Sequence, residues 1–137
     1  MIKRSLQVYL AFVAFIFFEY GLALLVFGQG AGIGDIQLAE LQPAIDNQIR
    51  YSGGIFIGLA IITGWLILNI EKKITLMRIY CFMNALAGLG RLTSLLLVGP
   101  GLFAQTWAMA FELSAPLLLL WQYYARLESN KSLRSSG

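Results

Sequence analysis

The sequence contains no histidine and a single cysteine, and only 12% of its 137 residues are charged. Without histidine, the chain has no ligand for a histidine-bound haem or chlorophyll, no usual zinc site and no Ser-His-Asp triad. A lone cysteine, Cys81, excludes an intrachain disulfide and a Cys-x-x-Cys redox pair. We therefore expect no metal site, no cofactor and no enzymatic activity, and we interpret Cys81 as a small buried apolar residue.

The scarcity of charge also excludes an ordinary soluble domain, because 58% of the residues are hydrophobic. These residues gather in runs, and about 20 apolar residues in a helix cross the hydrocarbon core of a bilayer. The net charge of +3 does not indicate nucleic-acid binding, because most basic residues lie at the ends of the runs. The predicted fold is all-α, a single integral membrane bundle over residues 1–137. Its four transmembrane helices are expected at about residues 5–27, 49–70, 75–98 and 102–125, with a polar cytoplasmic tail at 126–137.

The connection between the first two runs, residues 28–48, has a different composition. It opens on a glycine-rich stretch typical of turns, followed by an imperfect helical stripe of apolar residues. Pro43 is expected to kink or end any helix here. We expect a short interfacial helical segment over the outer mouth of the bundle. A mobile connecting loop is the alternative.

The distribution of basic residues predicts the orientation. In the predicted topology only Arg50 falls on the opposite side from the other flanking basic residues. The positive-inside rule then places both termini in the cytoplasm, and we expect the bacterial inner membrane. The basic residues on the predicted cytoplasmic side are Lys3, Arg4, Lys72, Lys73, Arg78, Arg126, Lys131 and Arg134.

The third run carries an arginine at Arg91, which is costly inside a membrane unless a partner meets it. Two carboxylates are available, Glu19 in the first run and Glu112 in the last. Helix rise places all three in the outer half of the predicted bundle. Pro116 removes the helical partner of the Glu112 carbonyl, so Arg91 can be expected to serve that carbonyl together with the carboxylate.

Other polar residues share these helix faces or begin the second helix. Asn84 and Ser94 lie on the Arg91 face, while Asn47 and Arg50 are expected to cover the cluster from the outer side. The cluster is either a structural ion pair that fixes helix packing or a buried polar site for a ligand. The residues are Arg91, Glu112, Glu19, Arg50, Asn47, Ser94 and Asn84.

Small residues are expected to mark the helix contacts. Gly54 and Gly58 share one face of the second helix, where small side chains let backbones approach closely. Gly88 is expected to do the same on the third helix, and Pro116 to shape the fourth.

Several short motifs occur together in order along nearly the whole chain. They are Asn47-Gln48-Ile49-Arg50-Tyr51, Gly88-Leu89-Gly90-Arg91-Leu92-Thr93-Ser94, Gly99-Pro100 and Glu112-x-x-x-Pro116. With these motifs the chain resembles a bacterial domain-of-unknown-function family of small four-helix membrane proteins. The resemblance implies a four-helix membrane fold and no established activity.

Two functions follow as expectations. The first is a non-catalytic accessory or structural subunit of a larger membrane complex, in contact with lipid and with other subunits or further copies of itself. The alternative is a binding or transport module for a small amphipathic ligand, such as a lipid, quinone or sterol-like molecule, at the polar cluster. The small size and the small-residue helix faces favour the first.

Overall fold

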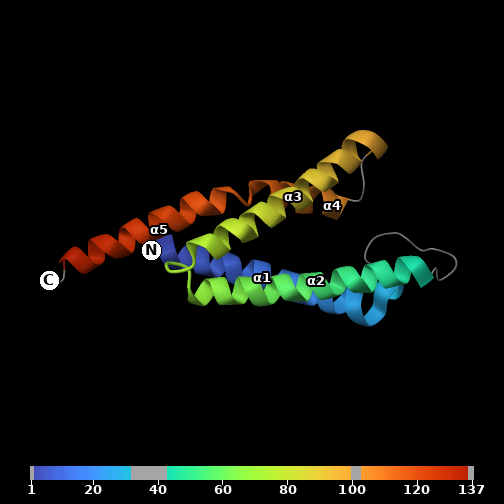
Figure 1. Ribbon diagram of the computed structural model, residues 1–137, viewed down its shortest axis with the longest axis horizontal. Coiled ribbons are helices and arrows are strands. Elements are labelled where there is room, and N and C mark those ends of the chain that lie inside the picture. Colours follow the sequence, from blue (N-terminus) through green and yellow to red (C-terminus); the bar gives the residue numbers. More distant parts are fainter. Residues whose placement is uncertain (1, 32–42, 100–102, 136–137) are drawn as a thin grey trace. The chain divides into compact units, whose positions relative to one another are not determined.

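The computed structural model describes residues 2–31, 43–99 and 103–135, and within these ranges it is helical with short turns. Three helices are long and apolar enough to cross a membrane: α1 together with the turn η1, α2 and α3. The all-α prediction is confirmed for the described residues. The elements, shown in Figure 1, are α1 (Ile2–Phe27), the 3₁₀ turn η1 (Gly28–Ala31), α2 (Pro43–Leu68), α3 (Ile74–Val98), α4 (Phe103–Ser114) and α5 (Leu117–Ser135).

Three boundaries differ from the prediction. Helix α2 begins at Pro43 rather than near residue 49, so the expectation that Pro43 would kink or end a helix was wrong. Proline suits a first helical turn, because its missing N–H would lack a partner there anyway. The fourth run is divided into α4 and α5, and α5 continues through the predicted polar tail to Ser135. Of the predicted interfacial segment, η1 is described, whereas residues 32–42 lie outside the described residues.

The chain falls into two compact units, which are described separately. The first, Val8–Leu68, is called the α1–α2 unit; the second, Met1–Gln7 with Asn69–Gly137, is called the α3–α5 unit. Each unit has its own buried residues. Leu10, Leu24 and Leu66 are buried in the first, and Leu6, Met77 and Leu118 in the second.

In the α1–α2 unit the two helices approach until their backbones touch. A Cβ atom built on Gly53 would lie 2.6 Å from the Leu25 nitrogen, and one built on Gly21 would lie 2.9 Å from the Gly53 oxygen. Only glycine fits at such distances. A Cβ on Gly54 or Gly58 would meet no described atom within 4 Å. Gly54 and Gly58 therefore do not lie in the contact between α1 and α2, and their predicted packing role stays a prediction.

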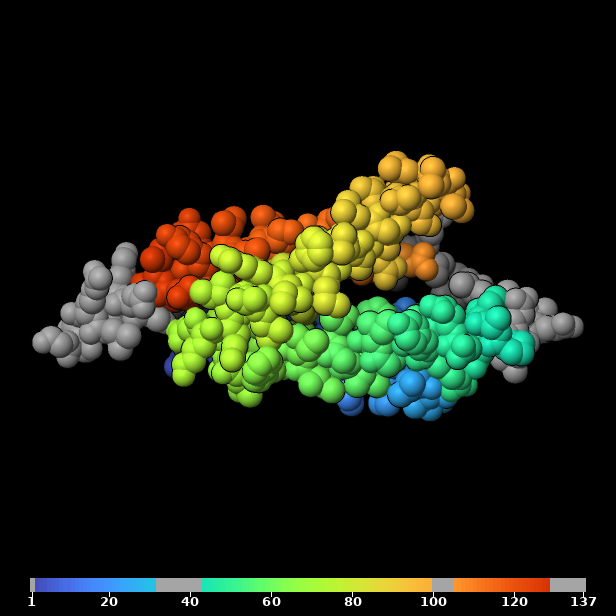
Figure 2. Space-filling view, viewed as in Figure 1, coloured from blue at the N-terminus to red at the C-terminus, as the bar shows by residue number. Residues whose placement is uncertain are grey.

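Helix geometry explains why Gly53, and not Gly54, faces α1. Successive residues point about 100° apart, so Gly53 and Gly54 cannot present the same face. Gly53 and Ala60 are buried, seven residues apart on one face of α2. Next to them, the rings of Tyr20 and Phe56 meet edge to face, with 4.9 Å between centroids. Figure 2 shows η1, in blue, against the first turns of α2.

In the α3–α5 unit, contacts between distant parts of the chain gather at one end. The amide groups of Lys72 and Lys73 both donate to the Asn69 carbonyl, which closes the turn before α3. The buried side chain of Gln122 on α5 donates to the Ile70 carbonyl in the same turn. Lys3 pairs with Glu71 at 3.0 Å, so the first turn of α1 meets this turn as well. The Ile2 amide also donates to Glu128 on α5.

Gly53 and its neighbour Gly54 offer a matched test of the α1–α2 contact. We expect Gly53→Leu to lower the free energy of unfolding by about 1–3 kcal/mol or more, because overpacking forces the two backbones apart. Gly54→Leu removes a glycine from the same helix without meeting a neighbour, so it should leave stability unchanged or raise it slightly. Thermal unfolding of both variants in one detergent measures the difference. Equal melting temperatures would contradict the observed contact.

Candidate functional site

The site in the α3–α5 unit begins with a close contact between α3 and α4. A Cβ on Gly88 would lie 2.9 Å from Leu113 Cγ and 3.0 Å from Glu112 Cβ. The bare Gly88 backbone therefore lets α4 approach, and it does so at Glu112 itself. The prediction that Gly88 lies at a helix contact is confirmed.

Arg91 lies one helical turn beyond Gly88 on the same face of α3. Its Nε atom donates to both carboxylate oxygens of Glu112, at 2.9 Å to Oε2 and 3.2 Å to Oε1. The side chains are 33% exposed for Arg91 and 13% exposed for Glu112. The expected ion pair between these two residues is therefore present. Because two different helices supply the charges, the pair also fixes the register of α3 against α4.

The Glu112 carbonyl behaves differently from the prediction. The helix breaks at Ala115 and Pro116, between α4 and α5. The Ala115 amide donates to the Glu112 carbonyl at 3.3 Å, and no hydrogen bond from Arg91 to this oxygen is found among the described residues. The expectation that Arg91 serves the carbonyl was wrong, because a tighter local turn supplies a donor from the same segment.

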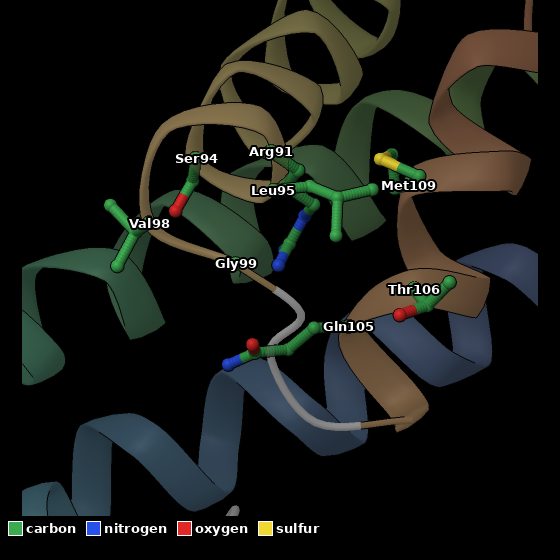
Figure 3. Close-up of a pocket in the computed structure, with 8 residues that line it drawn as sticks. All are labelled: Arg91, Ser94, Leu95, Val98, Gly99, Gln105, Thr106 and Met109. Carbon is green, nitrogen blue, oxygen red and sulfur yellow. The ribbon is translucent and has the colours of Figure 1, made fainter.

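A pocket of about 340 Å³ lies between the last turns of α3 and the first turns of α4 (Figure 3). Arg91 extends into it from α3, and Gln105 and Thr106 lie across from it on α4. The two helices are antiparallel, so the end of α3 and the start of α4 lie together beyond their contact at Gly88. Polar and apolar side chains both contribute. The lining residues are Arg91, Ser94, Leu95, Val98, Gly99, Gln105, Thr106 and Met109.

Gly99 closes the α3 side of the pocket. Its amide donates to the Leu95 carbonyl at 3.1 Å, and its φ angle is +112°. Side chains with a Cβ rarely adopt such a φ angle, so glycine is the natural residue at this helix end. Pro100 and Gly101, predicted to continue the turn, lie outside the described residues.

Of two further residues predicted for the cluster, Ser94 and Asn84, only one lines the described pocket. Ser94 lines the pocket. Asn84 is buried, but its side-chain amide donates to the Tyr80 carbonyl one turn earlier in α3. The Asn84 side chain therefore forms a hydrogen bond within its own helix, and it is not among the residues that line the pocket. Its spacing from Arg91 put it on a similar face without bringing it to the pocket.

Glu19, Asn47 and Arg50 belong to the α1–α2 unit, so their predicted place in the cluster stays a prediction. Glu19 and Asn47 are exposed there. Arg50 is engaged within this unit: its Nε atom donates to Asp46 at 2.7 Å, and its Nη1 atom donates to the Leu25 and Val26 carbonyls at 2.8 and 2.9 Å. Arg50 thus satisfies carbonyls left open at the end of α1.

Asp46 also accepts a hydrogen bond from the Gln29 amide at 2.8 Å. We call this group of contacts between the end of α1, η1 and the start of α2 the Asp46–Arg50 corner. Gly28 has a φ angle of +54°, and its lack of a side chain makes space for Asp46 and Arg50, because a Cβ there would collide with both. The role of Asp46 was not predicted from the sequence. The four-residue spacing of Asp46 and Arg50 was the available signal, because such charges meet on a helix surface.

A family model described as a domain of unknown function, DUF4345, matches residues 5–123. No curated protein and no solved structure matches the chain significantly. The match covers the Arg91–Glu112 pair, the pocket and the Asp46–Arg50 corner.

Proposed function

The chain belongs to the DUF4345 family, whose function is unknown, and from the site itself we propose a non-catalytic membrane protein that binds a small amphipathic molecule. The observation that carries the proposal is the pocket beside Arg91. A guanidinium, two hydroxyl groups and a side-chain amide line this pocket of about 340 Å³ together with apolar side chains. Ligand sites commonly combine a few polar groups with apolar walls in this way, and this volume is near their lower limit.

We propose that the protein crosses the membrane four times. Helix α1 with η1, α2 and α3 are each long enough. We propose that α4 and the apolar part of α5 form one further span with a kink at Ala115–Pro116. Together, residues 103–125 would extend about 34 Å at 1.5 Å per residue, which suffices for a bilayer core of about 30 Å.

Both termini are proposed to face the cytoplasm of a bacterial inner membrane. Support comes from the α3–α5 unit, where Lys3, the turn at Lys72–Lys73 and the Glu128 end of α5 gather at one end through the Lys3–Glu71 and Ile2–Glu128 contacts. Segments that meet at one end of a bundle share one side of the membrane. Their basic residues then mark that side as the inner one.

Cysteine labelling in intact cells tests this topology. With Cys81 replaced by serine, a cysteine at Asn47 should react with a membrane-impermeant maleimide, because the start of α2 lies on the outer side. A cysteine at Lys72 should react only after the cells are opened. Labelling at Lys72 in intact cells would reverse the proposed orientation.

The ligand proposal predicts that an amphipathic molecule copurifies with the protein. Native mass spectrometry of protein extracted in a mild detergent should show it bound. Met109→Trp should remove it, because the larger side chain fills the pocket while both Arg91 and Glu112 are kept. Met83→Trp is the matched control, since Met83 is exposed elsewhere on α3. A wild-type protein without bound molecules, or equal retention by both variants, would contradict the proposal.

A second function, an accessory subunit of a larger membrane complex, is favoured by a different observation. Gly54 and Gly58 on α2 have no described neighbour within 4 Å. Such a face accepts a helix from another subunit or from a second copy. In the same purification, a stoichiometric protein partner lost in Gly58→Leu would favour this function over the ligand-binding one.

A further inference from the structure

The terminal nitrogens of Arg91 are the part of the ion pair left open to the pocket. A guanidinium carries five N–H groups, one on Nε and four on the two Nη atoms. Nε donates to Glu112, and no hydrogen bond of the Nη atoms is found within the described part of the chain. Figure 3 shows the guanidinium pointing into the pocket. The pocket therefore offers donors and requires a ligand with acceptor oxygens.

The charge of Arg91 is already balanced. Glu112 holds the guanidinium at 2.9 Å, so the pair is neutral as a whole. Arg91 is the sole charged residue among the eight that line the described pocket. An anionic group bonded to the Nη atoms would bring a second negative charge close to the Glu112 carboxylate. In a low-dielectric site an uncompensated charge is strongly unfavourable.

A neutral acceptor avoids this cost. The carbonyl oxygen of an ester or a quinone accepts hydrogen bonds from a guanidinium without adding charge. The hydroxyl groups of Ser94 and Thr106 can supply further donors from the pocket wall. The ion pair thus leaves hydrogen bonding available at Arg91 while removing most of its attraction for anions.

The size of the pocket limits what enters it. A volume of about 340 Å³ holds one ring or one ester group, but not a complete lipid. Arg91 is seven residues from the end of α3 at Val98, about 10 Å along the helix. Leu97 and Val98 are 80% and 85% exposed, and Val98 also lines the pocket, so the pocket is continuous with an apolar surface at the end of α3. A hydrocarbon tail can continue along this surface into the bilayer.

We propose that the pocket selects electrically neutral amphiphiles that carry a carbonyl oxygen, and that Glu112 sets this selectivity by cancelling the charge of Arg91. The proposal rests on the proposed ligand-binding function and names its ligand class. The shared chemistry is a carbonyl acceptor on an apolar tail, whether it comes from a lipid ester or from a quinone ring.

The test compares two probes with the same acyl chain, one with a neutral ester head group and one with a carboxylate. Methyl laurate and laurate have the same chain, and at pH 8 only laurate is anionic. Each is titrated, at equal mole fraction in the micelle, into the delipidated full-length protein in a neutral detergent, with binding read by native mass spectrometry. We expect the wild type to bind the ester at least about tenfold more tightly than laurate, a difference of about 1.4 kcal/mol.

Glu112→Gln isolates the cause of the selectivity. The amide can still accept a hydrogen bond from Arg91, but it leaves the guanidinium charge unbalanced. We expect this variant to favour laurate instead. Laurate binding more tightly to the wild type, or an unchanged preference in folded Glu112→Gln, would overturn the proposal while leaving the ligand-binding function in place.

A short-chain benzoquinone in the same assay separates the two ligand sources. Tighter binding of the quinone than of methyl laurate assigns the pocket to a ring carbonyl, and the reverse assigns it to a lipid ester. Either result supports the proposed selectivity. If the ester, laurate and quinone all fail to bind the wild type, the selectivity and the ligand-binding function fall together.

Discussion

The ion pair between Arg91 and Glu112 is the interaction on which the α3–α5 unit depends. A guanidinium within an apolar helix needs an opposite charge, and the sequence of α3 contains no Asp or Glu, so the partner of Arg91 must come from another helix. Glu112 can reach it because Gly88, one turn away, lets α4 approach to van der Waals contact. The close contact and the pair act together: the glycine sets the distance between the helices, and the charges set their register.

The break at Ala115–Pro116 follows directly after this contact. Proline prevents the usual helical bond to the Glu112 carbonyl, and the Ala115 amide takes its place in a tighter turn. On the other side of the contact, α3 and α4 continue toward Gly99 and Gln105 and line the pocket. The pair therefore lies between the break and the pocket, and its Arg91 is the charged residue among the described residues that line the pocket.

Much of this arrangement could be predicted from the sequence because it arises from strong local constraints. A charged residue within an apolar run needs a partner, which pointed to Arg91 and Glu112, and the run lengths predicted the long helices. The face of α2 that packs could not be predicted in the same way. Three glycines, at 53, 54 and 58, offered two faces, and the contact with α1 selected Gly53. The bond from Gln122 to the Ile70 carbonyl joins residues 52 positions apart, and no local pattern indicates it.

Arg91 and Glu112 are expected to stabilise the protein as a pair. A double-mutant cycle measures this directly, from the unfolding free energies of Arg91→Leu, Glu112→Leu and the double variant in one detergent. Each single variant strands one charge, whereas the double variant removes both charges together. The double variant should be more stable than the sum of the single effects predicts, by about 1 kcal/mol or more. Strict additivity would show that the two side chains do not interact in the folded protein.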